Sequence, residues 1–347
     1  MTGDPLGSLA GLRWLSWHLW AGWNDHWVWW SWNLPADLQL MLQYEFIRNA
    51  FAAGTMIAIV AGVVSYLVVL RRSSFAAHAL GHVGFSGAAG AVLFGVNPFF
   101  GLLSFTTVSG GGIALLGKRA SHRDVEIGSV LAFMLGLGLL FLSFYNGFAT
   151  EAYSILFGEI VGVTTQQVWF TFWASLPVLV VLGWFYRQLL FASLDEEVAE
   201  AKGMHTVILG VVFMLALAVA ISIAVTVIGV LLIFALTVTP AAIAVRLVSR
   251  PFHAVLLSVG IALFATWTGI FVAFYEVEPT SFFIVTIVFA IYLIVRAAPA
   301  VSGALSPVRA PAVTPAPPPM TLHAPGEPPL AVPGEGSSLP ADGTGGS

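Results

Sequence analysis

Long apolar runs recur along this 347-residue chain and restrict it to one class of fold. The protein is 58% hydrophobic and only 9% charged, whereas soluble domains carry about 25% charged residues. The runs are long enough to cross a hydrocarbon core of about 30 Å as helices, and they lack the short alternating pattern of membrane strands. The sequence therefore predicts an all-α, multi-pass helical bundle in a membrane.

Nine membrane spans are predicted within residues 46–296. The sixth and seventh share one long apolar stretch, so the turn between them is the boundary that the sequence defines least. Residues 147–167 are too polar to cross a membrane and indicate a short re-entrant or surface helix. The nine spans are expected at residues 46–70, 78–96, 99–117, 127–146, 168–186, 206–225, 229–248, 254–275 and 281–296.

The lysine and arginine residues give the orientation, because cytoplasmic loops are enriched in them. Placing the loop after the first span in the cytoplasm leaves only Arg13 and Arg48, of the 13 basic residues, outside. The N-terminus is then outside and the C-terminus inside. The basic residues on the cytoplasmic side are Arg71, Arg72, Lys118, Arg119, Arg123, Arg187, Lys202, Arg246, Arg250, Arg296 and Arg309.

The two ends of the chain differ from the bundle between them. Eight of the 12 tryptophans precede residue 36, and tryptophan prefers the headgroup layer. Residues 1–45 are therefore predicted as an interfacial amphipathic segment, with a crossing helix as the alternative. Twelve of the 19 prolines lie in residues 297–347, which predicts a disordered cytoplasmic tail.

The run "HALGHVGFSG" places His78 and His82 four residues apart in an apolar, glycine-rich span. That spacing puts both imidazoles on one helical face. Ionisable groups inside a span mark ion or substrate paths by default, and neutral imidazole is a good ligand for zinc, iron, copper and nickel. A metal path and a pair of packing histidines both remain open at this point.

Two segments resemble enzyme motifs, but each lacks a residue that the chemistry requires. "GIALLGKR" resembles a phosphate-binding loop, but it ends in Arg119 instead of Ser or Thr and closes a membrane span. "HALGH" has the spacing of a zinc protease motif, but Ala79 stands where the general-base glutamate belongs. The chain is therefore predicted to have no ATPase site and no protease site of its own.

The loop sequence "SLDEEVAEAKGM" predicts a short cytoplasmic helix. Ser193 and Glu196 match a capping box, Asp195 and Glu197 favour the first turn, and Gly203 ends the helix. Such a helix is either a docking surface for a partner or a solvated connector. The residues predicted to dock are Asp195, Glu196, Glu197, Ala199, Glu200 and Gly203.

Five ordered segments together resemble the permease subunits of ABC importers for zinc, manganese and related metals. "LRRSSFAAHALGH" is similar to that family's segment ending in an aspartate and a histidine, and "RDVEIG" to its acidic turn. "ILFGEIVGVT", "DEEVAEAKG" and residues 228–247 match three further family segments. The family's aspartate and histidine correspond to His78 and His82, so this chain departs from the family at His78.

The resemblance implies a transport subunit of a bacterial plasma membrane importer, without a tightly bound cofactor. The transported ion would bind His78 and His82, with Asp124 and Glu159 as further candidate ligands. An all-imidazole pair favours zinc over manganese. The implied partners are an ATP-binding subunit, an extracytoplasmic metal-binding protein, a second copy of the permease and membrane lipid, with no nucleic acid. The alternative is a stand-alone, ion-coupled secondary transporter that uses the histidines as a relay.

Overall fold

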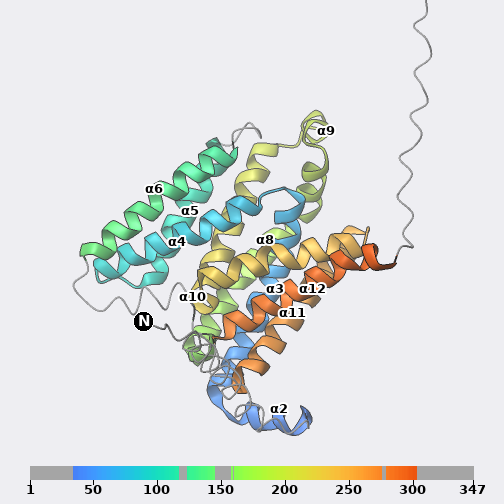
Figure 1. The fold of residues 1–347 in the computed structure, drawn as a ribbon. Coiled ribbons are helices and arrows are strands. Elements are labelled where there is room, and N and C mark those ends of the chain that lie inside the picture. Colours follow the sequence, from blue (N-terminus) through green and yellow to red (C-terminus); the bar gives the residue numbers. More distant parts are fainter. Residues whose placement is uncertain (1–33, 117–122, 145–157, 159, 276–278, 303–347) are drawn as a thin grey trace, which may run out of the picture. The chain divides into compact units, whose positions relative to one another are not determined.

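The structure is a computed structural model that describes residues 34–116, 123–144, 158, 160–275 and 279–302. Every regular element within these ranges is a helix (Figure 1). Most of the tryptophan-rich segment and of the proline-rich tail lies outside them. The helices are α2 (Leu34–Gln43), α3 (Glu45–Leu70), α4 (Ser74–Leu93), α5 (Pro98–Leu116), α6 (Arg123–Phe144), η2 (Ile160–Gly162), α8 (Thr165–Leu194), α9 (Glu196–Ala201), α10 (Thr206–Leu247), α11 (Pro251–Tyr275) and α12 (Thr280–Ser302).

Each predicted span coincides with a helix or with part of one. Within the described residues, seven helices are long and apolar enough to cross a membrane. They are α3, α5, α6, α8, α11, α12 and the first part of α10, while Leu232–Leu247 forms a shorter apolar helix. The predicted span at residues 78–96 is α4, which lies outside this set because glycine, serine and histidine lower its hydropathy.

The predicted turn between the sixth and seventh spans is replaced by a single-residue break in α10. Gly229 has φ 78° and ψ 166°, a backbone conformation that is open almost only to glycine. Hydrogen bonding on either side is helical, so no separate loop forms. Figure 1 shows the two halves of α10 running in different directions.

Contacts with α3 give the direction of each half of α10. In the first half, Gly210 lies beside Arg71 at the end of α3, whereas Ala224 lines the same cavity as Ile57 and Ala61 in the middle of α3. In the second half, Ile233 lines that cavity too, and the backbone N–H of Ala241 donates to Ser65 Oγ at 3.1 Å, nearer the end of α3. The halves therefore run in opposite senses along α3, as two successive spans require.

The polar segment before α8 is only partly described. Residues 147–157 and 159 lie outside the described residues, so the short helix expected within 147–167 stays a prediction; the described part is a 3₁₀ turn, η2, followed by α8. Thr164 caps α8 through a capping box with Gln167. This side-chain cap explains why α8 begins at Thr165, three residues before the predicted span.

Two groups of helices meet at α10. Helices α4, α5 and α6 pack side by side, and α4 and α5 also contact α10 (Figure 1). On the other side, α3 packs against α8, α10 and α11. Helix α12 continues to Ser302, so residues 297–302, predicted as the start of the tail, are helical because the first of them are alanines that extend the last span.

Candidate metal site

The two predicted histidines form a contacting pair near the start of α4. The ring centres of His78 and His82 are 4.6 Å apart and the ring planes are inclined by 77°. Both side chains are half-buried. The predicted shared face is therefore confirmed, because residues four apart on a helix lie one above the other.

The distance between the rings allows both to bind one ion. A metal ion bonded to one nitrogen of each ring at about 2.0–2.1 Å would lie roughly 3.2 Å from each ring centre. With the centres 4.6 Å apart, the ion and the two centres make an angle of roughly 90°. Neighbouring ligands of a six-coordinate ion subtend such an angle, and the tetrahedral angle that zinc prefers is wider.

One wall of the histidine site comes from the second half of α10. The Phe234 ring lies 4.9 Å from the His78 ring, at 69° to it. Between the histidines, Gly81 faces Val230 and Ile233, and a Cβ there would lie 3.5 and 3.7 Å from their side chains. The sequence predicted a turn between residues 225 and 229, where the structure has the break at Gly229, but it did not predict the contact of Phe234 with His78.

The glycines around the histidines pack closely against neighbouring helices. Gly84 faces Leu102 and Thr106 of α5, and Gly90 faces Phe141 of α6. At Gly87 the backbone touches that of Gly101 on α5, so that any Cβ would overlap the Gly101 carbonyl oxygen. The glycines therefore let α4 pack closely against three helices at once.

Of the two acidic candidate ligands, only Asp124 lies within the described residues, and it forms no metal site with the histidine pair. Asp124 is exposed in the first turn of α6, and Glu159 lies outside the described residues. Within the part of the chain that is described, no three His, Asp or Glu side chains come together as a metal site. The two imidazoles supply two of the four or more ligands that such ions take.

The predicted cytoplasmic helix is present as α9, but its cap differs from the prediction. Asp195 is the N-cap, and its Oδ1 accepts from the Val198 N–H at 2.9 Å. Ser193, the predicted cap, instead donates to the Leu189 carbonyl within α8. Helix α8 reaches Leu194 before the chain turns, so Asp195 is the first residue free to cap. Gly203 follows with φ 80°, as a helix-ending glycine should.

The predicted docking residues of α9 divide into three kinds. Glu196 and Glu197 are exposed, while Ala199 is fully buried and fixes the helix to the bundle. Glu200 accepts a hydrogen bond of 2.5 Å from the Thr206 hydroxyl at the start of α10. The exposed surface of α9 therefore carries all three of its glutamates, of which Glu200 is bonded to α10, together with Val198 and Ala201.

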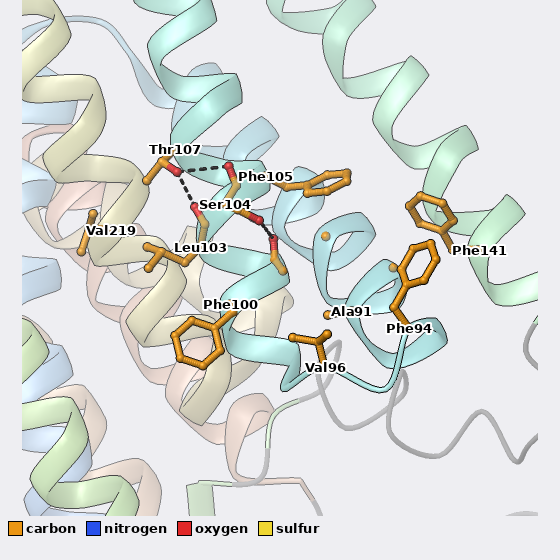
Figure 2. Close-up of a pocket in the computed structure, with 13 residues that line it drawn as sticks. Ala91, Phe94, Val96, Phe100, Leu103, Ser104, Phe105, Thr107, Phe141 and Val219 are labelled. Carbon is orange, nitrogen blue, oxygen red and sulfur yellow. Dashed lines mark hydrogen bonds between the residues drawn. The ribbon is translucent and has the colours of Figure 1, made fainter.

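A separate apolar groove lies at the far end of α4, between α4 and α5 (Figure 2). Phe94, Phe100 and Phe141 line it. The hydroxyls on its α5 wall are used within that helix, because Ser104 donates to Gly101 O and Thr107 to Leu103 O. The groove thus offers mainly apolar and aromatic surface.

Comparisons with known proteins agree on the family. The model of the ABC 3 transport family matches residues 43–298. The manganese transport system membrane protein MntC of Listeria monocytogenes is 29% identical over 214 residues, covering 61% of this chain and 76% of that protein. The manganese import system permease protein ScaB of Streptococcus gordonii is 29% identical, covering 68% and 85%.

A solved structure agrees as well. PsaBC from Streptococcus pneumoniae in complex with Fab contains a chain that is 26% identical and superposes with a TM-score of 0.68. The match covers 76% of this chain and 95% of that one. The chain therefore belongs to the ABC 3 transport family, as a multi-pass membrane permease of the metal-importer type.

Proposed function

We propose that this permease passes zinc into the cytoplasm through a path that includes His78 and His82. The observation that carries the proposal is the contact between the two imidazoles, 4.6 Å apart inside the bundle. Two half-buried imidazoles on one face are costly in a membrane unless they bind something or pair. A transported divalent ion supplies that partner, and no tightly bound cofactor is needed.

Manganese is the competing ion, because two relatives carry it in their names. A nitrogen pair binds zinc more strongly than manganese, whereas carboxylate oxygen suits manganese. This chain has His78 where the family pattern places a carboxylate. The substitution therefore supports zinc, while Asp124 and Glu159 stay candidate oxygen ligands along the path.

Uptake of labelled zinc and manganese by cells that carry the whole transporter tests this proposal. We expect His82→Ala to abolish zinc uptake with normal membrane insertion, and His78→Asp to keep transport while raising the share of manganese. Phe264→Ala, a change at an exposed α11 side chain, is the control. Wild-type zinc uptake by His82→Ala would show that the histidines only pack.

The same proposal assigns the energy source and the outside partner to other chains. An ATP-binding subunit would drive transport, an extracytoplasmic protein would deliver the ion, and a second permease copy would complete the path. The purified chain should then hydrolyse no ATP. ATP hydrolysis by this polypeptide, free of any co-purified subunit, would contradict the assignment of ATP hydrolysis to a separate subunit.

Docking of the ATP-binding subunit is assigned to α9. Reversing the charge of the first two exposed glutamates (Glu196→Lys with Glu197→Lys) should weaken recovery of that subunit by pull-down and leave insertion unchanged. Glu200 is left intact because it holds α10 through Thr206. Gln188→Lys, an exposed change on α8, is the charge control. Full recovery of the subunit by the double variant would rule out the docking role.

The secondary-transporter alternative retains one supporting feature. Such transporters use broken helices at corresponding positions of two inverted repeats. The structure shows a break at Gly229, but the alternative needs a matching pair of breaks. Uptake that persists without the ATP-binding subunit would favour it over the importer.

A further inference from the structure

The His78 imidazole is held by two aromatic neighbours. His82 contacts it from the same helix, at 4.6 Å and 77°. Phe234 contacts it from α10, at 4.9 Å and 69°. Both contacts are edge-to-face, the arrangement that aromatic rings favour. Phe234 cannot bind a metal, so its contact acts on the orientation of the ring it touches.

The position of Phe234 follows from the break in α10. Val230, Ile233 and Phe234 lie on one face of the helical turn that begins after Gly229. Val230 and Ile233 pack on Gly81, which lies three residues after His78 and directly before His82, and Phe234 continues this contact to His78. The turn is firmly placed, because Val230 and Ile233 are each only 3% exposed.

The break at Gly229 is contacted by the segment that precedes α8. Gly158, with φ 73°, touches the Ile228 carbonyl and the Gly229 nitrogen. The segment that follows is tied to α3, since Asn49 Nδ2 donates to Val163 O at 3.2 Å. Several independent contacts therefore fix the point from which Phe234 reaches the histidine.

We propose that Phe234 is a positioning residue for metal binding, which holds the His78 imidazole edge-on so that it shares one ion with His82. This inference rests on the proposed function, because it assumes that the pair binds metal. A histidine at the start of a span otherwise has rotamer freedom that must be lost when it binds.

Zinc binding to the purified full-length chain in detergent, measured by titration calorimetry with zinc alone, tests the proposal. We expect Phe234→Leu to weaken the affinity about 3- to 10-fold, the range that corresponds to one aromatic pair. Phe234→Tyr keeps the ring and should stay within about 2-fold of wild type. Phe264→Leu, an exposed phenylalanine on α11, should change nothing.

A double-mutant cycle with His78→Ala shows whether Phe234 acts through His78. Adding Phe234→Leu to His78→Ala should cause no further loss of zinc affinity. An equal loss in both backgrounds would mean that Phe234 acts on the fold and would overturn the proposal. If Phe234→Leu does not accumulate, Phe234→Ile takes its place in the same cycle.

The remaining outcomes separate the two proposals. If His78→Ala binds zinc as wild type does, the metal site of the proposed function is wrong. If His78→Ala weakens binding while Phe234→Leu and Phe234→Ile do not, the site stands and the positioning role is wrong.

Discussion

Helices α4 and α6 lie side by side, but α4 is mostly buried within the protein and α6 is mostly exposed. Ten of the 20 residues of α4 are glycine or alanine, and most of its side chains are buried. Helix α6 has the higher mean hydropathy, but only 11% of its membrane-spanning segment is buried. Its exposed side chains include Phe133, Leu139 and Phe144. A span enclosed by protein needs small residues for close packing, whereas a span facing lipid needs apolar bulk. Hydropathy alone does not separate the two situations, because α3 and the first part of α10 are at least as apolar as α6 and are mostly buried.

The largest effect should come from a glycine on the inner helix. Gly87→Leu places a side chain against the backbone of Gly101, where nothing flexible can yield. We expect loss of folded protein, since overpacking against backbone exceeds the usual cost of about 1–3 kcal/mol. Gly136→Leu on α6 is the matched control, because a Cβ there meets nothing within 4 Å. Size-exclusion profiles of detergent extracts measure the amount of folded protein for both variants. Equal amounts would contradict the claim that α4 is closely packed at Gly87 and α6 is open at Gly136.

A deletion of apolar volume should give the next largest difference. Leu80 on α4 is fully buried, so Leu80→Ala should cost about 2–5 kcal/mol through the cavity that it leaves. Phe133 on α6 is 66% exposed, and lipid can replace its ring in Phe133→Ala, for about 0–0.5 kcal/mol. Thermal unfolding of the two variants in the same detergent measures the gap. A greater loss for Phe133→Ala would show that the outer face of α6 is covered in the assembled protein.

The smallest effect concerns the hydrogen bond that joins these two helices. Ser86 Oγ on α4 donates to the Met134 carbonyl of α6 at 2.5 Å. Ser86→Ala should lower stability by about 0.5–1.5 kcal/mol. Ser129 donates within α6 to the Val125 carbonyl and is exposed, so Ser129→Ala should be near neutral. Indistinguishable melting temperatures for Ser86→Ala and wild type would mean that the glycine contacts alone join α4 to α6.

Much of the molecule could be predicted because its signals are local. Long apolar runs predict helices wherever they lie, and the four-residue spacing of His78 and His82 implies a shared face in any helical context. The cap of α9 was placed two residues too early, because Ser193 and Asp195 are both good caps. Only the length of α8, which is set by packing, decides between them.

The sequence by itself determined the class of fold, the helices and the residue types of the candidate site, since these depend on composition and on spacing along one helix. The tertiary structure decided which helices surround α4, that the chain reverses at Gly229, and that Phe234 meets His78. Phe234 and His78 are 156 positions apart, and no periodicity relates residues across such a separation. Their contact exists because a single glycine breaks α10 where Gly158 packs against it, and only the folded chain brings these residues together.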